Sequence, residues 1–560
     1  MRIPLFYFIR KYPSVRFILF FLINGLILGS VIFFAFSTIH SAFITGVYPQ
    51  IVRPGERVAL NGLHFGNRPA NAWVFIGGHT IKSEQCIEWT ETKIVFDAPD
   101  YLKEDLVSVV TRSKRSNAVL LVNSDILPVI SKTSTFENRP YIESLETDFG
   151  NVGDLISIRG KNFGQNRNAS AVVFTGTDDT VPVYNSDGQA EVFGVECNEY
   201  DFDYDYWSDR ELRIRVPDAA ESGSIVVITD AGVSNPVPFR LKNKYGSKIY
   251  SDKRMYRLVS EVEISDFQAQ QPNTFFLRIP VPQKTASQRS VTLESASPDP
   301  FIVSYQNASL YRFHDIAEGR KLHIRQEYRV DRSEIKTELT VNAFRNGTPN
   351  NPSLYAVYTE PDALLPADDA VIKKACAAIV KDEINPYRRA QRIYMYLLSE
   401  MTLRKTAEQD VGKSILTAFN DKNGDAYDAA LLFCTMARAA GIPAIPTAGL
   451  LVDAEKQTVL HWWAEFYLNG FGWVPVDLAL ASGVPFDTGV PDKARWYFGN
   501  LDAYHIAFSR GFQNQAPMLP GGRTAERIRS YAFSSIWEEA TVSIERYSSL
   551  WRLPKVIGVY

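Results

Sequence analysis

The sequence is poor in the residues that build metal centres and disulfide frameworks. It contains four cysteines and seven histidines among 560 residues. The cysteines are scattered and show no C-x-x-C spacing, which argues against a disulfide framework, although a single Cys86–Cys197 bridge stays conceivable. The histidines are few and unclustered along the chain, so we predict no metal site and no cofactor.

The chain also carries almost no net charge. The 60 Lys and Arg residues nearly balance the 63 Asp and Glu residues, which leaves a formal charge of −3. A chain with this balance has no general attraction for nucleic acid, so we predict no nucleic-acid partner. Its length exceeds what one hydrophobic core can hold, and three or more domains are expected.

One long uncharged run stands near the N-terminus. Residues 17–37 are apolar and follow a basic segment, residues 1–16. About 20 apolar residues suffice to span a bilayer, and the preceding positive charges predict a cytoplasmic N-terminus. We therefore predict a single-pass membrane anchor, with everything beyond it extracytoplasmic, in the periplasm or at the cell surface. A cleaved signal peptide is the alternative.

An internal repeat follows the anchor. Residues 53–66 align with residues 151–164, and Trp89, Pro99 and Asn117 keep the spacing of Trp207, Pro217 and Asn235. Short alternating segments between turn residues predict β-sandwiches. The glycine pattern and the closing Ser-Asn pair resemble the IPT/TIG immunoglobulin-like family, so we expect such domains over residues 44–124 and 140–243.

The second copy carries an insertion, roughly residues 178–206, that ends in alternating acidic and aromatic residues from Glu199 to Tyr206. In a strand, such alternation places all carboxylates on one side and all rings on the other. We predict an edge strand here. A calcium site at Asp201 to Asp205 and a partner-binding surface stay open as alternatives.

The remaining chain divides into three parts. Residues 244–360 alternate again, which predicts a further β-sandwich, and residues 361–520 begin with helical spacing. Residues 521–560 contain aromatic side chains but no clear motif, and we expect a helix followed by a loose tail. The predicted fold class is thus multidomain: a transmembrane helix, tandem β-sandwiches and an α+β core.

The core contains a spaced set of motifs. Gly424-Asp425-Ala426 precedes a helical run that ends in Gly441-Ile442-Pro443-Ala444, followed by His461-Trp462-Trp463-Ala464-Glu465 and by Gly472-Trp473-Val474-Pro475-Val476-Asp477. This pattern resembles the transglutaminase-like superfamily, relatives of the papain-like cysteine proteases. The resemblance implies a catalytic cysteine at position 426, where this chain has alanine.

The resemblance assigns roles to the surrounding residues. His461 and Asp477 correspond to the catalytic dyad, and a turn at residues 469–472 would place them across a hairpin. Trp463, Asp425 and Trp473 are expected to line the pocket. Asp425 is also a candidate N-cap, with Asp428 in the first helical turn.

Three functional hypotheses follow. Alanine cannot be a nucleophile, so the first is a membrane-anchored pseudoenzyme that binds or scaffolds a protein or peptide through the groove or the IPT/TIG-like domains. The second is an active protease or acyltransferase that uses another group. Cys434 lies eight residues along the same helix, about 12 Å away, and is expected to be a buried structural thiol. The third is that Ala426 replaces a natural cysteine by engineering.

Overall fold

The computed structural model divides the chain into two compact units, Met1–Thr133 and Ser134–Tyr560. It describes residues 42–49, 51–76, 79–102, 104–111, 114–123, 139–176, 183–184, 190–191, 194–242, 244–345, 347–405, 414–519 and 521–560. The predicted basic tail and membrane span lie outside these residues. Within the described ranges, no helix is long and apolar enough to cross a membrane.

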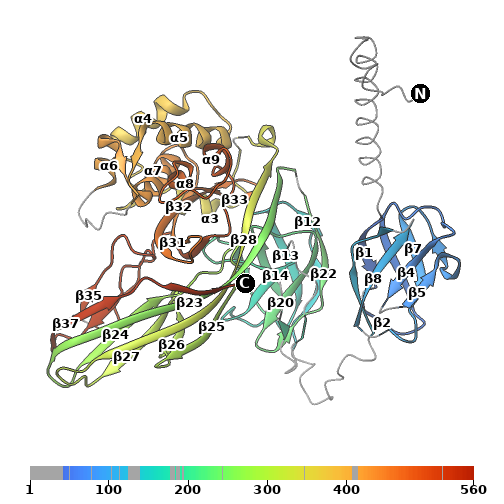
Figure 1. The fold of residues 1–560 in the computed structure, drawn as a ribbon, viewed down its shortest axis with the longest axis horizontal. Helices are drawn as coiled ribbons and strands as arrows, with labels where there is room; N and C mark the ends of the chain where they lie inside the picture. The colour runs from blue at the N-terminus through green and yellow to red at the C-terminus, as the bar shows by residue number, and fades with distance from the viewer. Residues whose placement is uncertain are drawn as a thin grey trace, which may run out of the picture. The chain divides into compact units, whose positions relative to one another are not determined.

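The first unit is a β-sandwich (Figure 1). One sheet has the order β1-β3-β7-β6 and the other β2-β10-β8-β4-β5, with β9 paired to β8. Alternating residues of both sheets form the buried core between them, as along β3, where every second side chain is buried. The strands are β1 (Phe43–Tyr48), β2 (Ile51–Val52), β3 (Arg57–Leu63), β4 (Ala72–Ile76), β5 (His79–Lys82), β6 (Glu88–Trp89), β7 (Lys93–Asp97), β8 (Glu104–Thr111), β9 (Lys114–Arg115) and β10 (Val119–Asn123).

The second unit begins with a sandwich of the same topology. Its sheets have the orders β11-β13-β19-β18 and β12-β22-β20-β14-β17, with β21 paired to β20, so each strand has a counterpart in the first sandwich. A small hairpin, β15 (Val183–Tyr184) and β16 (Ala190–Glu191), belongs to the insertion. The other strands are β11 (Tyr141–Leu145), β12 (Phe149–Gly150), β13 (Leu155–Lys161), β14 (Ala171–Phe174), β17 (Val195–Glu196), β18 (Tyr204–Trp207), β19 (Glu211–Arg215), β20 (Gly223–Thr229), β21 (Gly232–Val233) and β22 (Val237–Leu241).

Matched hydrogen bonds confirm the predicted repeat. Asn117 bonds both backbone groups of Ile44, and Asn235 does the same for Ile142. In each copy the repeat tryptophan donates its indole N–H to the backbone carbonyl of the motif phenylalanine. The repeated glycine of β13, Gly160, has no room for a Cβ, which would lie 2.1 Å from a carbonyl oxygen of β11. The sandwich architecture is confirmed, and membership of the IPT/TIG family stays a prediction.

The third β-sandwich combines strands that follow the second sandwich in sequence with strands near the C-terminus. One sheet contains β25 (Ser290–Ser297), β28 (Leu322–Leu339), β23 (Gly246–Ala269), β37 (Ile544–Trp551) and β38 (Lys555–Val559). The other contains β26 (Ile302–Tyr305), β27 (Ala308–His314), β24 (Thr274–Pro280), β36 (Glu538–Ala540) and β35 (Arg523–Ala525). Figure 1 shows the C-terminal strands in red beside the green and yellow strands. The prediction of a loose tail was wrong, because these strands pair with β23 and β24 and bury Trp537 and Ile544.

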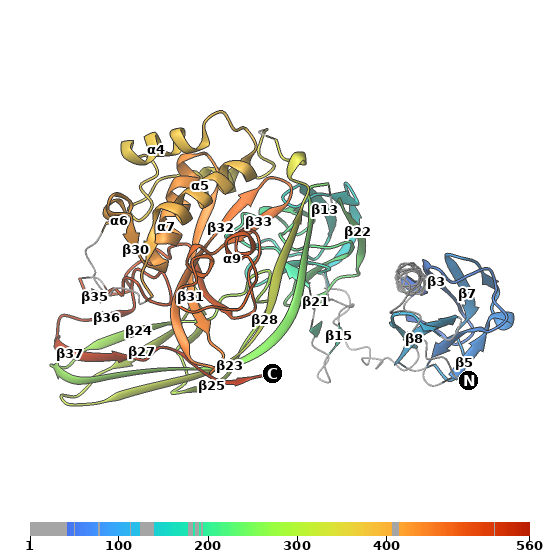
Figure 2. The ribbon, with the colours of Figure 1, turned by 45° about the horizontal axis from the view of Figure 1, so that its top comes forward.

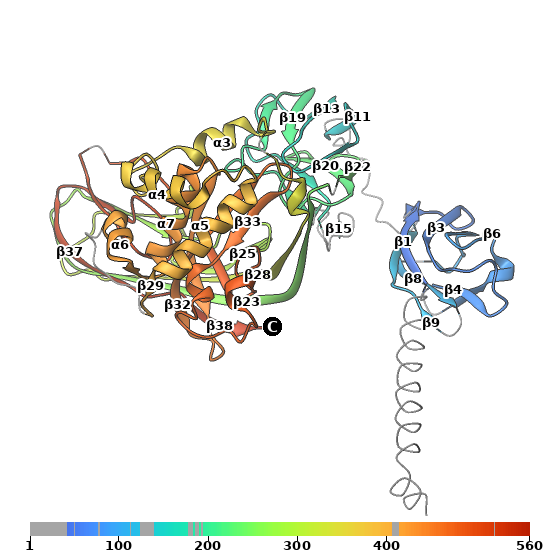
Figure 3. The ribbon, with the colours of Figure 1, turned by 90° about the horizontal axis from the view of Figure 1, so that it is seen from above.

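The α+β core is inserted in sequence between strands β28 and β35 of the third sandwich. Its sheet has the order β33-β32-β31-β34, and helices pack on it (Figures 2 and 3). Its elements are β31 (Ala444–Val452), β32 (Thr458–Leu468), β33 (Gly472–Val476), β34 (His505–Arg510), α3 (Pro352–Thr359), α4 (Ala370–Val380), α5 (Pro386–Glu400), α6 (Ile415–Asp421), α7 (Ala426–Ala439), α8 (Leu478–Ala481) and α9 (Lys493–Trp496), with a small pair, β29 (Thr402–Leu403) and β30 (Asn423–Gly424). Helix α7 is buried on nearly all sides, as expected of a helix that is apolar all round.

The acidic-aromatic segment agrees with the predicted edge strand only in part, since Tyr204–Trp207 is β18, at the edge of its sheet. Residues 199–202 form a turn, Phe202 has a positive φ of 56°, and only Tyr204–Trp207 is a strand. Asp201 is buried, and it accepts hydrogen bonds from Trp473 Nε1 at 2.9 Å and from Arg510 at 3.3 Å. These tertiary partners override the alternating pattern. The segment fixes the second sandwich to the α+β core.

Candidate functional site

Helix α7 begins with a reciprocal cap. The Asp425 side chain accepts hydrogen bonds from the backbone N–H groups of Tyr427 (3.0 Å) and Asp428 (3.2 Å), and Asp428 accepts one from the Asp425 N–H (3.0 Å). The predicted N-cap role of Asp425 is confirmed. Gly424 is required here, because a Cβ would lie 2.7 Å from the Asp428 Cβ. Burial, reinforced by the neighbouring Asp425 charge, raises the pKa of Asp428 despite a facing arginine.

That arginine is Arg529, which sequence analysis missed. Its two terminal nitrogens donate to Asp425 and Asp428 at 2.7 Å each, and its guanidinium lies 4.5 Å from the centre of the Tyr427 ring. All three charged side chains are buried. The segment predicted to be a loose tail therefore clamps the start of the site helix. The separation of more than 100 residues left no local signal for this contact.

Ala426 occupies the first turn of α7 and is partly exposed. A side chain there lies at the positive end of the helix macrodipole, which is where a thiolate would be favoured. The methyl group of alanine has no such chemistry. Tyr427 packs its ring edge-on against Trp462 at 5.6 Å, so this end of α7 lies beside the part of β32 that carries His461.

His461 and Asp477 form a hydrogen-bonded pair. The turn predicted at residues 469–472 is present, since Leu468 pairs with Gly472, and it returns β33 alongside β32. The distance between His461 Nε2 and Asp477 Oδ2 is 2.6 Å, and both side chains are fully buried. His461 Nδ1 is buried and has no hydrogen-bond partner in the described part of the chain. The hydrogen bond to Asp477 uses only Nε2 of His461, so Nδ1 stays available to a further hydrogen-bonding group.

A second imidazole shares the same carboxylate. His505 Nε2 lies 2.9 Å from Asp477 Oδ2, and His505 Nδ1 lies 2.8 Å from Asp502 Oδ1. An ionised carboxylate only accepts hydrogen bonds, so both nitrogens of His505 carry protons and the ring is an imidazolium. Burial opposes this charge, but Asp502 and Asp477 outweigh it and raise the pKa of His505 to about 9. Burial likewise opposes the charge on Asp477, but His461 and His505 hold the pKa of Asp477 well below its ordinary value.

This cluster predicts a stability that depends on pH. The pKa of His505 is about 9 in the folded protein, against about 6.5 in an unfolded chain. Its stabilisation is therefore complete below about pH 6.5 and is lost as the pH rises through about 9. We expect the free energy of unfolding to fall by up to about 3 kcal/mol over this range. Chemical denaturation at several pH values measures the decline, and H505Q should flatten it. An equally steep decline in H505Q would contradict the assignment.

The same residues bear on metal binding. One nitrogen each from His461 and His505 and one oxygen of Asp477 lie within 4.8 Å of one another. Among the described residues, this is the group of side chains whose spacing could hold a metal ion. His461 and His505 are separated in sequence but adjacent in space, which their spacing along the chain did not indicate, and the expectation of no metal site stays a prediction. In the structure these three atoms are already joined by the two hydrogen bonds to Asp477.

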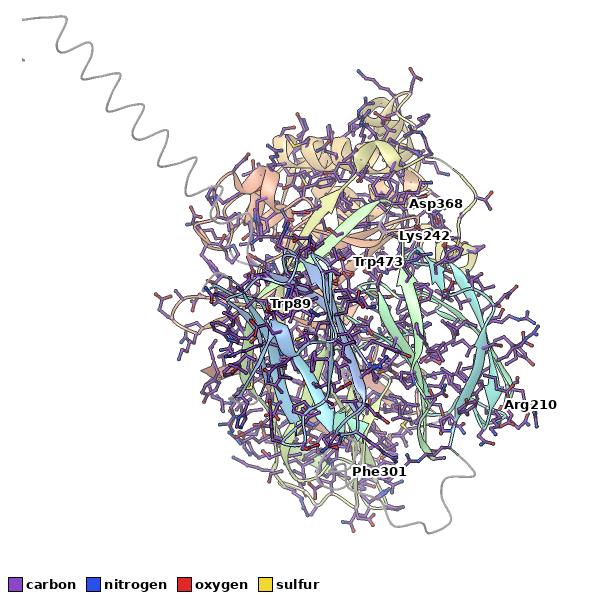
Figure 4. The ribbon with its side chains drawn as sticks, turned by 90° about the vertical axis from the view of Figure 1, so that its right-hand side faces the viewer. Trp89, Arg210, Lys242, Phe301, Asp368 and Trp473 are labelled. Carbon is purple, nitrogen blue, oxygen red and sulfur yellow. The ribbon has the colours of Figure 1, made fainter. Side chains whose placement is uncertain are left out.

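The three predicted pocket residues lie in different surroundings. Trp463 is buried beside the dyad, with its ring 6.2 Å from that of His461 and 5.0 Å from that of His505. Asp425 is engaged by Arg529. Trp473, labelled in Figure 4, bonds Asp201 through its indole N–H. The structure therefore does not gather them into one pocket.

Glu465, the last residue of the His-Trp-Trp-Ala-Glu motif, has a structural partner. Arg510 donates to it from Nε at 2.9 Å and also binds Asp201 of the second sandwich. The Arg510 guanidinium lies 5.1 Å from the centre of the Trp473 ring. Two motif residues thus hold the domain junction.

Comparison with known proteins identifies the class of this domain. Residues 373–478 match the family model of the transglutaminase-like superfamily. The match extends from α4 to the start of α8 and includes Ala426, His461 and Asp477. The chain therefore contains a transglutaminase-like domain, within the predicted core of residues 361–520.

Individual relatives are more distant. An uncharacterised protein of Haemophilus influenzae is 30% identical over 173 residues, which cover 25% of this chain and 46% of the relative. The chain thus matches about half the length of that relative. A candidate cysteine protease from Cytophaga hutchinsonii shares 15% identity over 56% of this chain and 91% of its own, with a TM-score of 0.33. The periplasmic domain of TgpA from Pseudomonas aeruginosa shares 13% over 42% and 88%, with a TM-score of 0.23. TM-scores this low do not bear on function.

Proposed function

We propose that this chain is a transglutaminase-like pseudoenzyme that binds or scaffolds a protein or peptide outside the cytoplasm. In this proposal residues 17–37 anchor the chain in the membrane with the N-terminus cytoplasmic, and the later domains face the periplasm or the cell surface. His461 and Asp477 are a vestigial dyad, and Ala426 marks the inactive nucleophile position. The partner binds through the site beside Ala426 or through the two repeated sandwiches.

The observation that carries the proposal is the state of the thiols. Position 426 has none, and all four cysteines of the chain are buried in hydrophobic cores. Burial raises the pKa of Cys376 to about 12 and that of Cys86 to about 11, and it also raises the pKa values of Cys197 and Cys434. Each of them lacks the low pKa and the exposure that a nucleophilic cysteine needs. Cys86 and Cys197 lie in the cores of separate sandwiches, so the bridge considered from sequence is absent.

The other elements of a transglutaminase-like site are present, which supports a pseudoenzyme that keeps the shape of the site without its nucleophile. The helix cap, the His461–Asp477 hydrogen bond and the stacked Trp463 ring are all in place. Hydrogen-bonding groups and aromatic walls can bind a ligand without a nucleophile.

Restoring the thiol tests this interpretation. We expect A426C to be alkylated with a midpoint below pH 8.5, the ordinary value for a cysteine, because the thiolate would lie at the N-terminus of α7. The measurement is the rate of iodoacetamide labelling against pH. A439C is the matched control, since Ala439 is also partly exposed but ends the same helix, where the dipole disfavours a thiolate.

The unsubstituted chain should label slowly at all these pH values. Rapid labelling of a native thiol would overturn the assignment as a pseudoenzyme. An A426C profile that coincides with that of A439C would show that the start of α7 does not favour a thiolate, and the assignment of position 426 as an inactive nucleophile position would then be rejected.

A further inference from the structure

The second unit contains a cavity of about 830 Å³ where the second sandwich, the third sandwich and the α+β core meet. Pockets for small molecules have volumes of about 300–1,000 Å³, so this cavity is large enough to hold a ligand. Its walls include the acidic turn of the second sandwich, the first part of β23, and Trp473 and Arg510 of the core. Neither Ala426 nor His461 is among the lining residues, so this cavity is separate from the vestigial dyad.

Three strands that line the cavity are edge strands. Strand β17 ends one sheet of the second sandwich, and β25 and β26 end the two sheets of the third sandwich. Each has a side that pairs with no further strand in the described part of the chain. Edge strands present open backbone N–H and C=O groups, and proteins normally cover or charge them.

Strand β26 is the most open of the three. Ile302 and Val303 of β26 are 37% and 55% exposed, and Phe301, which directly precedes the strand, is 48% exposed. Val303 itself lines the cavity, together with Val291 and Leu293 of β25. An exposed apolar edge strand of this kind invites another strand to pair with it.

The charges in the walls are largely paired with one another. Asp218 binds Lys248, and Glu199 binds Arg167. Arg510 is shared by Asp201 and Glu465. These pairs leave little net field to attract an ion, so backbone hydrogen bonding and apolar contact dominate what the cavity offers.

We propose that an extended peptide segment of a partner protein binds this cavity by adding a strand to the edge of β26. Alternate apolar side chains of the peptide would contact Val303, Val291 and Leu293. This mode obtains affinity from main-chain hydrogen bonds and specificity from pockets for alternate side chains. The proposal rests on the peptide-binding role given above and assigns it to a site away from the dyad.

The test uses the full-length protein in a detergent without a sugar head group. A phage-displayed library of random 12-residue peptides is selected on the wild type, and binding of the selected peptides is measured by fluorescence anisotropy. We expect V303K to weaken binding at least tenfold, because a charge on an edge strand blocks pairing. V542K is the matched control, since Val542 is 72% exposed and does not line the cavity. Backbone N-methylation of alternate peptide residues should abolish binding while keeping every side chain.

Other results would overturn the proposal. Peptides that bind V303K as well as wild type, or that tolerate N-methylation, do not add a strand to β26. If binding is lost in A426W but kept in V303K, the peptide-binding function stands and its site is beside α7. If no peptide is selected, or if only cellohexaose or chitohexaose binds, the cavity is not a peptide site, whereas the alkylation profiles still decide the pseudoenzyme assignment. Thermal unfolding establishes that each variant is folded.

Discussion

Replacing Arg529 by methionine should destabilise the transglutaminase-like domain by about 3–5 kcal/mol. The substitution keeps much of the side-chain volume but removes the charge that faces Asp425 and Asp428. Both carboxylates are almost completely buried, and each bonds a separate nitrogen of Arg529 at 2.7 Å. Without Arg529 both buried carboxylates lose this partner, although Arg404 lies 3.9 Å from Asp428 Oδ2, and a buried charge that has lost its partner costs more than the pair itself contributes. Chemical denaturation measures the change.

Two further variants make this expectation specific. R546M is the matched control, because Arg546 is exposed, and it should change stability by less than about 0.5 kcal/mol. Adding D425N and D428N to R529M should recover part of the loss, since asparagine caps helices well and carries no charge. If R529M unfolds like the wild type, the ion pairs of Arg529 with Asp425 and Asp428 do not stabilise the start of helix α7.

The parts of the structure that could be predicted are those encoded locally. The repeated sandwiches follow from turn residues at fixed spacing, and the hairpin between His461 and Asp477 follows from its Asn-Gly turn. The capping role of Asp425 also needed only its neighbours. These features depend on periods and contacts within a few residues, which a single sequence displays directly.

The missed features depend on long-range contacts. His505 lies 28 residues beyond Asp477, and its only local sign is Asp502 three residues earlier. The turn at Asp201 replaced an expected strand because Trp473 and Arg510, more than 250 residues away, satisfy its carboxylate. The C-terminal strands were missed because their partner strands occur nearly 300 residues earlier. Tertiary partners of this kind override local propensity.

Replacing Asp477 by alanine should also cost about 3–5 kcal/mol. The Asp477 carboxylate accepts hydrogen bonds from His461 and His505 and caps helix α8 through the Leu480 N–H at 2.9 Å. Without it, His461 loses the hydrogen bond at Nε2, and His505 retains only Asp502. Because both rings are fully buried, water cannot replace the lost acceptor without a rearrangement.

The pH dependence separates an electrostatic cause from simple loss of packing. Since Asp477 helps to raise the pKa of His505, D477A should lower that pKa and reduce the loss of stability between about pH 6.5 and 9. D492N is the control, because Asp492 is exposed and makes no side-chain cap bond at α9. If D477A were destabilised but kept the wild-type pH slope, Asp502 alone would hold the imidazolium. If it were as stable as the wild type, the preserved dyad would be incidental to the fold, and only a binding role could account for its geometry.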